Sequence, residues 1–404
     1  MLPRPPEVAV PPARHLDGAL PDREQACRLL TQLIAAPPPP RLPADSGPVV
    51  LYGAGELGQM AAAWCRDFGV RIQGVVDAAA ARWNGHPAWA AHRVLAPQEV
   101  PAQWRHEHRL LTCISTLPQV PLSAELRTQG WQEVQPFYDF ADDWHTPRHP
   151  LNNGWRAPLP AGGPALAQLR AVLDGWDDAV SRAHHLQFLA WRCRRQEWSF
   201  DEAPVVPDER YFIAELAACW RPGERIVDGG AYHGQMLARW LRERPGWLAR
   251  AWALEPDPAN YGALRRWHAG LPPPLGGRIA LHPLALGRRS GRRRFVTGQG
   301  YGSRLWPLGD HTVELRPLDA QPWSPTYVKL HLEGGEAAAL AGAASTLARS
   351  RPLLALTVYH RRDGLWATAA YLMRTLPTYR WLFRLHGWLG TGAVIYGLPH
   401  ERCA

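Results

Sequence analysis

Lysine is almost missing from this chain of 404 residues. All of its 45 cationic side chains are arginine except one, Lys329. A background that replaces lysine by arginine wherever the two are interchangeable keeps lysine only where a compact charge with a readily shifted pKa is needed. One lysine must fall somewhere by chance, but its place inside YVKLHLEGGE favours a functional role for it.

Long apolar runs and cysteine pairs are also missing. No apolar run reaches the roughly 18 residues of a membrane span. The proline-rich N-terminus contains no apolar segment of the secretory type, so we expect a cytoplasmic protein. The six cysteines form no CxxC pair and no Cys/His cluster with zinc spacing, which predicts reduced, packed thiols. The acidic and histidine residues show no spaced ligand set, and we expect no metal.

The composition is that of a soluble globular protein, with 46% hydrophobic and 20% charged residues and a net charge of +9. The arginines are scattered and accompany no nucleic-acid-binding motif, so nucleic acid is not an expected partner. We interpret the densest cluster, residues 287–295, as the solvated face of a hairpin. A basic surface would also suit an anionic substrate such as a nucleotide-linked or acidic sugar.

Composition and turn signals divide the chain into four parts. We expect a Pro-rich flexible lead over 1–46 with one short helix, a Rossmann-like domain over 47–145, a helical connector over 146–204 and a second α/β domain over 205–404. Strands alternating with helices predict doubly wound parallel sheets that bind ligands at the carboxyl ends of their strands. Two closely spaced final strands predict an antiparallel hairpin. In the connector, His184 and His185 are expected to be solvated or capping residues.

The first α/β domain carries a dinucleotide-type fingerprint. Gly53, Gly55 and Gly58 form GxGxxG after a predicted strand, and Asp77 stands close to the position of a ribose-binding acid. On YGAGELG, GVVD and the turns NGHPAW and VLAPQEV, the region also resembles the nucleotide-sugar-binding domain of some sugar acyltransferases. That resemblance implies a nucleotide-sugar partner. An empty crevice that only stabilises the fold, and a redox role with NAD, remain open alternatives.

The second domain carries a different turn. RIVDGGAYHG predicts a strand, a glycine-bearing turn and a helix, and AWALEPDPANY predicts a strand that ends in Glu255. Gly230 and Gly234 allow the backbone to approach a ligand closely. Glu255 can accept hydrogen bonds from both hydroxyls of a ribose, and Asp228 can hold the turn or a ligand's ammonium group. The spacing offers no cradle for a pyrophosphate, so a ligand with a ribose and no phosphate, such as S-adenosylmethionine, fits better.

DGGAYHG, ALEPDPANY, PLALG, YVKLHLEGGEAAALAGA and RPLLALTVYH, in this order, resemble the FkbM-type methyltransferase family across the whole second domain. The resemblance implies a class I methyltransferase fold, S-adenosylmethionine as methyl donor and transfer to a hydroxyl, often on a sugar or glycoside. It places Glu255 at the ribose, Ala285 beside the adenine, and Lys329 and Glu333 in the family's Lys-x-Asp-x-Glu-Gly run. The donor turn would comprise Asp228, Gly230, Tyr232 and Gly234, where Tyr232 replaces a frequent Asn.

The Asp of the Lys-x-Asp-x-Glu-Gly run is His331 in this chain. Methyl transfer is an in-line displacement that needs alignment and a base for the hydroxyl proton, and imidazole can accept a proton at neutral pH. Because alternate residues of a strand share one face, Lys329, His331 and Glu333 can all point into one crevice. We expect His331 to be the base, with Glu333 orienting it or the substrate.

Other interpretations of His331 remain open: a structural replacement, or a mark of lost activity. The alternative function is therefore a non-catalytic protein that binds the donor or a nucleotide-sugar. His360, Asp363 and His386 are weaker candidates for lining the acceptor site. The sequence alone identifies neither the acceptor nor the oligomeric state.

Overall fold

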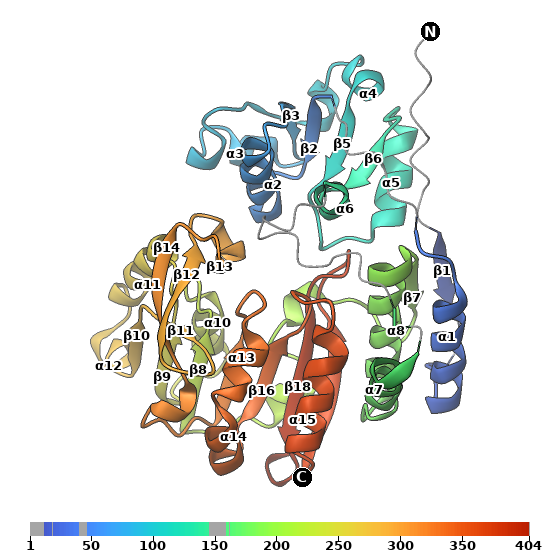
Figure 1. Ribbon diagram of the computed structural model, residues 1–404. Coiled ribbons are helices and arrows are strands. Elements are labelled where there is room, and N and C mark those ends of the chain that lie inside the picture. Colours follow the sequence, from blue (N-terminus) through green and yellow to red (C-terminus); the bar gives the residue numbers. More distant parts are fainter. Residues whose placement is uncertain (1–11, 18, 40–46, 145–158, 161, 404) are drawn as a thin grey trace.

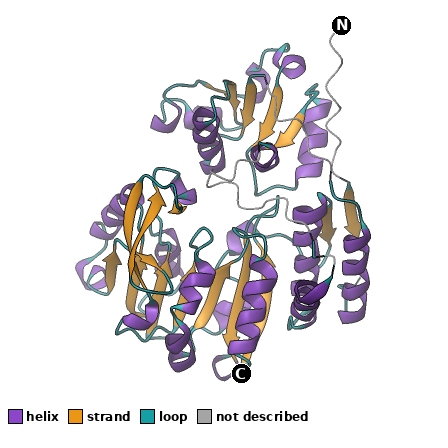
Figure 2. Ribbon diagram, in the orientation of Figure 1, coloured by secondary structure: helices purple, strands orange, loops and turns teal. Residues whose placement is uncertain are grey.

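The computed structural model describes residues 12–17, 19–39, 47–144, 159–160 and 162–403 (Figure 1). Two α/β domains follow one another, and between them in sequence lie two helices, α7 (Gly163–Asp174) and α8 (Ala179–Arg194). Figure 2 shows strands gathered into sheets, with helices against them in both domains. No helix in the described ranges is both long and apolar enough to cross a lipid bilayer.

The N-terminal segment packs against the connector. The predicted helix is present as α1 (Arg23–Ala35), and Asp22 caps it by accepting a hydrogen bond from the backbone N–H of Gln25. Its apolar face, which includes Leu30 and Leu33, is buried against α8, and β1 (Ala13–Leu16) pairs in parallel with β7 (Glu197–Phe200). Over the described residues this segment therefore differs from the flexible lead that its composition predicts, because α1 presents a helical stripe of apolar side chains that needs a partner.

The first domain is a five-stranded parallel sheet in the order β4-β3-β2-β5-β6. Its GxGxxG turn joins β2 to α2, as the sequence predicts. The strands are β2 (Val49–Tyr52), β3 (Ile72–Val76), β4 (Val94–Leu95), β5 (Arg109–Thr112) and β6 (Val134–Pro136), and the helices are α2 (Glu56–Asp67), α3 (Ala80–Trp83), α4 (Trp104–Glu107), α5 (Gln119–Thr128) and α6 (Phe137–Asp143).

The second domain has a seven-stranded sheet in the order β10-β9-β8-β15-β16-β18-β17. All neighbours are parallel except β18, which runs antiparallel to both β16 and β17, so the predicted final hairpin is confirmed. The strands are β8 (Glu224–Gly229), β9 (Leu248–Leu254), β10 (Ile279–His282), β15 (Tyr327–Leu330), β16 (Leu353–Thr357), β17 (Tyr379–Leu385) and β18 (Ala393–Pro399).

Helices and a small sheet complete this domain. The Arg-rich cluster lies on exposed β12 (Gly291–Val296), which pairs antiparallel with β14 (His311–Arg316) beside the short strands β11 (Ala285–Leu286) and β13 (Arg304–Leu305). The helices are α9 (Ala214–Ala218), α10 (Gln235–Glu243), α11 (Pro258–Ala269), α12 (Pro273–Gly276), α13 (Glu336–Ala341), α14 (Ala344–Ser350) and α15 (Ala369–Thr375), the last preceded by a π-helical turn over Gly364–Thr368.

Two expectations about single residues are wrong. His184 and His185 are not solvated: both are buried, His185 accepts a hydrogen bond from Trp176 Nε1, and α8 packs against α1, β7 and β17. Two of the six cysteines are not reduced thiols, because Cys219 and Cys403 form a disulfide. The C-terminal 3₁₀ turn over His400–Arg402 returns the chain to α9, which brings together two cysteines that are far apart in sequence.

Candidate functional site

One cavity of about 890 Å³ is lined by residues of both domains. The lining residues follow the carboxyl ends of β2, β3 and β5 in the first domain and of β8, β9, β15 and β16 in the second. The binding edges of the two sheets therefore open into the same space, although each sheet has its own connections. The predicted site residues that line this cavity are Gly53, Gly55, Asp77, Gly230, Tyr232, Glu255, Ala285, Lys329, His331 and Glu333.

The turn after β8 is shaped by a close approach of two strands. Gly230 has φ +72°, and a Cβ there would lie 2.0 Å from the carbonyl oxygen of His331. Gly234 has φ +87° and begins α10 against the ring of Trp267. Only glycine satisfies both requirements at either position. Gly230 lines the cavity, whereas Gly234 and the buried Asp228 lie behind its wall.

Asp228 and Lys329 form a buried ion pair beneath this turn. Lys329 Nζ lies 2.9 Å from Asp228 Oδ1 and donates a hydrogen bond to the Gly230 carbonyl oxygen at 2.7 Å. Asp228 is fully buried, and apart from this ion pair neither of its carboxylate oxygens has a hydrogen-bond partner among the described residues. The chain's single lysine thus holds the turn, and the carboxylate keeps capacity for a further donor such as a ligand's ammonium group.

Glu255 closes the turn from the end of β9. Its two carboxylate oxygens accept the backbone N–H groups of Tyr232, at 2.8 Å, and of Asp257, at 2.9 Å. Burial raises the pKa of Glu255 to about 7. Tyr232 has φ +51°, and its hydroxyl reaches across to Glu56 of the first domain at 3.3 Å. At this position the backbone serves the turn, while the side chain contacts the other domain.

These residues fit S-adenosylmethionine. Glu255 suits the two ribose hydroxyls, and Ala285 of β11 contributes to an apolar part of the cavity wall suited to adenine. Asp228, paired with Lys329 beneath the turn, offers its remaining acceptor capacity to the ammonium group. A Cβ at Gly230 would collide with the neighbouring strand, so the cradle depends on glycine. The fit to S-adenosylmethionine therefore rests on Asp228, Gly230, Glu255 and Ala285.

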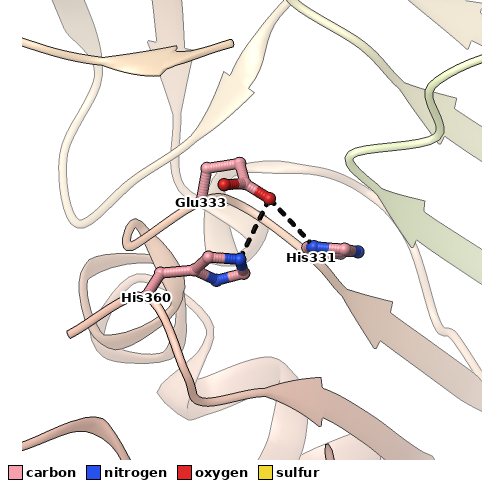
Figure 3. A group of neighbouring side chains, drawn as sticks. All are labelled: His331, Glu333 and His360. Atoms are coloured by element: carbon pink, nitrogen blue, oxygen red, sulfur yellow. Dashed lines mark ion pairs between the residues drawn. The ribbon is translucent and has the colours of Figure 1, made fainter. Parts of the chain in front are cut away.

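Beyond the end of β15, His331, Glu333 and His360 form a compact group (Figure 3). Glu333 Oε1 lies 2.9 Å from His331 Nε2 and 3.0 Å from His360 Nε2, and Glu333 Oε2 lies 3.1 Å from Arg304. Glu333 adopts φ +51°, an unfavourable conformation for a residue with a side chain, which turns its carboxylate toward the two rings. His360 Nδ1 faces Glu336 Oε1 at 3.4 Å.

The charges in this group follow from its burial and contacts. Burial lowers the pKa of His331 to about 4, so its ring is neutral at pH 7. Burial alone would raise the pKa of Glu333, but His360, His331 and Arg304 hold it well below its usual range. Burial alone would lower the pKa of His360, but Glu333 and Glu336 raise it. The group is therefore an ionised carboxylate between a neutral and a readily protonated imidazole.

The proton on His331 can be assigned from its neighbours. Ionised Glu333 only accepts hydrogen bonds, so Nε2 of His331 carries the proton that faces it. Nδ1 then has the free lone pair, and the hydroxyl of Tyr211 lies 2.8 Å from it. Tyr211 also lines the cavity, with φ +69°, and so connects the ring nitrogen with the open space.

The same three side chains could hold a cation. One nitrogen of each histidine and one oxygen of Glu333 all lie within 4.8 Å of one another, and two imidazoles with a carboxylate are a common transition-metal set. The spacing of these residues in the sequence shows no such set, because one of the three comes from a separate strand end. His331 and Glu333 are close in sequence, but His360 joins them only through the parallel pairing of β15 with β16.

In the first domain, Asp77 closes the glycine turn. Its carboxylate accepts the N–H groups of Ala54 and Ala79, both at 2.7 Å. A Cβ on Gly58 would lie 2.0 Å from the carbonyl oxygen of Gly53, so Gly58 lets α2 pack on β2 and does not itself line the cavity. Gly53, Gly55 and Asp77 face the space into which the donor turn also opens.

Several lining residues carry no sequence signal. Arg210 and Tyr211 lie in an irregular segment after the 3₁₀ turn Pro207–Glu209, and Tyr138 comes from the first domain. Tyr359, which follows β16, also lines the cavity, whereas His360, the next residue, does not line it and is buried rather than at the surface. His386 also lines the cavity, whereas Asp363 does not.

Comparison with solved structures identifies the fold. The chain is similar to a methyltransferase FkbM from Methylobacillus flagellatus KT, with a TM-score of 0.54, 17% sequence identity and coverage of 91% of this chain and 93% of that chain. The chain has the class I methyltransferase fold. A precorrin-6y C5,15-methyltransferase from Geobacter metallireducens GS-15 matches with a TM-score of 0.28, at 16% identity, over 48% of this chain and 98% of that chain. No sequence-family model and no curated protein sequence matches this chain.

Proposed function

We propose that the protein is an S-adenosylmethionine-dependent O-methyltransferase acting on a hydroxyl of a sugar, a glycan precursor or a glycosylated metabolite. The observation that carries the proposal is one cavity that combines a glycine turn with the strand-end acid Glu255 and the imidazole of His331, above the buried carboxylate of Asp228. The class I methyltransferase fold supports it. When bound, S-adenosylmethionine supplies an electrophilic methyl group for in-line displacement by the acceptor oxygen.

In this proposal the second domain binds and orients the donor. Asp228 takes the ammonium group, Glu255 accepts from the ribose hydroxyls, and Ala285 lies beside the adenine. Lys329 acts as a positioning residue, because its ammonium group holds Asp228 and the Gly230 carbonyl. Tyr232 contributes its backbone N–H to the placement of Glu255.

His331 accepts the proton of the acceptor hydroxyl. Its ring is neutral at pH 7, and Nε2 is engaged by Glu333, so the proton goes to Nδ1, directly or through the hydroxyl of Tyr211. Glu333 then stabilises the imidazolium that forms, because its ionised carboxylate lies 2.9 Å from Nε2. Glu333 and His331 thus act as an orienting acid and a base.

The first domain binds the acceptor's carrier. A nucleotide-sugar is the proposed ligand at Gly53, Gly55, Gly58 and Asp77, since Asp77 stands at a strand end suited to a ribose. Support comes from the shared cavity: a ligand seated at this turn and one seated at the donor turn occupy one continuous space. The sugar part of such a ligand is the part that would reach the second domain.

Calorimetric titration with S-adenosylhomocysteine tests the donor site. We expect micromolar binding by the wild type and its loss in Glu255→Ala, while Asp77→Ala, the matched change in the first domain, retains it. Circular dichroism of each variant separates lost binding from lost folding. Absence of binding by the folded wild type would end the methyltransferase proposal.

A second assay separates catalysis from binding alone. Transfer of label from methyl-labelled S-adenosylmethionine to a panel of nucleotide-sugars and glycosides is expected for the wild type. Donor binding without transfer to any member of a broad panel would favour the alternative function, a binding protein without turnover. A titration of absorbance with NADH addresses the redox alternative, which ends if no NADH binds.

A further inference from the structure

Arg210 is a half-buried arginine in the wall of the shared cavity. It directly follows the 3₁₀ turn Pro207–Glu209 and precedes Tyr211, whose hydroxyl contacts His331. Its backbone N–H donates to the Pro207 carbonyl oxygen at 3.3 Å, which fixes the start of the side chain. Arg210 therefore lines the cavity from an ordered segment, next in sequence to the tyrosine that contacts the proposed base.

Within the described ranges, the Arg210 guanidinium forms no hydrogen bond and no ion pair. The other cations of the cavity wall are accounted for: Lys329 pairs with Asp228, Arg239 pairs with Glu243, and Arg82 is exposed to water over the ring of Trp83. Buried arginines elsewhere have acceptors from the protein: Arg304 has Glu333, Arg195 has Asp139, and Arg192 donates to the carbonyl oxygens of Tyr359 and Gly390. Arg210 departs from this pattern.

The surroundings of Arg210 are phenols. Burial alone would lower the pKa of its guanidinium; the groups that act most strongly against this are Tyr359, Tyr211, Tyr396 and Tyr301, and none of them is charged at pH 7. A guanidinium remains charged at any physiological pH, and a charge that is partly withdrawn from water is costly unless an anion meets it. The protein supplies no such anion among these neighbours.

The position of Arg210 favours the acceptor as the source of that anion. Tyr359 follows β16, Tyr396 lies in β18, and His386 follows β17. These strands form the half of the sheet away from β8 and β9, which carry the turn and the acid of the donor site. Tyr211 and Tyr359, two of the phenols that act on the guanidinium, both contact His331, so Arg210 belongs to the His331 side of the cavity.

We infer that Arg210 is a specificity-determining residue that binds an acidic group, a carboxylate or a phosphate, on the acceptor. The inference rests on the proposed function and narrows its substrate class to anionic sugars or sugar conjugates. The planar fork of arginine matches such groups with two parallel hydrogen bonds. A hydroxyl beside that group would then lie near His331 and Tyr211.

The test uses the full-length protein saturated with S-adenosylhomocysteine. Two probes that differ in one group, D-glucuronate and D-glucose, are titrated by intrinsic tryptophan fluorescence and calorimetry, together with orthophosphate. We expect the wild type to prefer D-glucuronate by about tenfold or more, as one charged hydrogen-bonded pair allows, and orthophosphate to compete with it. Arg210→Gln should abolish the preference, and Arg210→Lys should retain part of it.

Arg242→Gln, which removes an exposed arginine of α10, is the matched control and should behave as the wild type. Equal binding of D-glucuronate by the wild type and Arg210→Gln, or no preference in the wild type, overturns the inference while leaving donor binding intact. The methionine carboxylate of the donor is the other source of an anion. If Arg210→Gln weakens S-adenosylhomocysteine but not 5′-methylthioadenosine, which lacks the amino-acid part, Arg210 belongs to the donor site and the acceptor assignment fails.

Discussion

The two crevices of this protein are built to the same plan. In the first domain, Asp77 accepts the N–H groups of Ala54 in the glycine turn and of Ala79 just after itself, both at 2.7 Å. In the second domain, Glu255 accepts those of Tyr232 and Asp257 at 2.8 and 2.9 Å. In each case the acid at the end of one strand closes the turn after its neighbour, which is how a parallel sheet prepares a place for a ribose.

What differs is the chemistry around the shared plan. The second crevice adds a buried carboxylate beneath the turn, Asp228, and an imidazole paired with a carboxylate, His331 and Glu333. The first crevice adds Glu56 at the start of α2, whose carboxylate accepts a hydrogen bond from the hydroxyl of Tyr232 in the second domain. A glycine turn closed by a strand-end acid is thus a general way to bind a nucleoside. The residues around that turn decide which ligand binds and which chemistry follows.

Glycine replacements should separate the two crevices most clearly. A Cβ at Gly230 or at Gly58 meets a backbone carbonyl oxygen at 2.0 Å, and Gly230 also has a positive φ. We expect Gly230→Ala to abolish S-adenosylhomocysteine binding and Gly58→Ala to lower thermal stability while sparing that binding. Each change should cost more than about 3 kcal/mol of local stability. Calorimetry with thermal unfolding measures both, and loss of donor binding in a folded Gly58→Ala protein would show that the crevices are not independent.

Removal of the base has no equivalent in the first crevice. His331→Ala should lower turnover by roughly 10²- to 10⁴-fold, the usual contribution of a general base, and leave the affinity for S-adenosylhomocysteine unchanged. Tyr211→Phe, which keeps the ring and removes the hydroxyl that contacts Nδ1, should lower turnover less. Unchanged turnover in His331→Ala rules out the base and leaves a structural role for this histidine.

The acid of the donor crevice should make donor binding depend on pH. Burial raises the pKa of Glu255 to about 7, and the ionised form is the better acceptor for ribose hydroxyls. Below its pKa, ligand binding must first remove a proton. Affinity for S-adenosylhomocysteine should therefore rise as the pH increases from 6 to 8, by up to about tenfold.

Glu255→Gln provides the control for this pH dependence, because the amide keeps one acceptor oxygen and cannot ionise. Its calorimetric affinity should be lower and flat across the same range. A wild-type affinity that is constant from pH 6 to 8 would mean that Glu255 does not receive the ribose. The same shift implies that folding stability decreases as the pH rises from about 4.5 through 7, since the buried acid must ionise.

Local spacing predicts both crevices because a turn and a strand-end acid are short-range features. Motif and periodicity arguments predict the motif residues of the second crevice and the final hairpin. They do not predict the shared cavity, because the mutual placement of the two sheets depends on contacts, such as that of Tyr232 with Glu56, that no sequence spacing encodes. The sequence gives no signal for Arg210 and only a weak one for His360, because each lies in a segment without a recognisable motif or periodicity. The prediction that His184 and His185 are solvated is wrong because α8 is covered on several sides, whereas a helical stripe of apolar residues predicts only one buried face.

The smallest expected effect concerns metal ions. His331, Glu333 and His360 are close enough to hold a cation, but Glu333 and Glu336 raise the pKa of His360, and a protonated imidazole is no ligand. Treatment with a chelator followed by desalting should therefore leave donor binding and turnover unchanged. Elemental analysis of the purified protein is the direct measurement. If the wild type contains one equivalent of a transition metal and His360→Ala contains none, a bound cation, and not a base, would activate the acceptor hydroxyl. The two crevices would then differ in their need for a metal as well as in their acids.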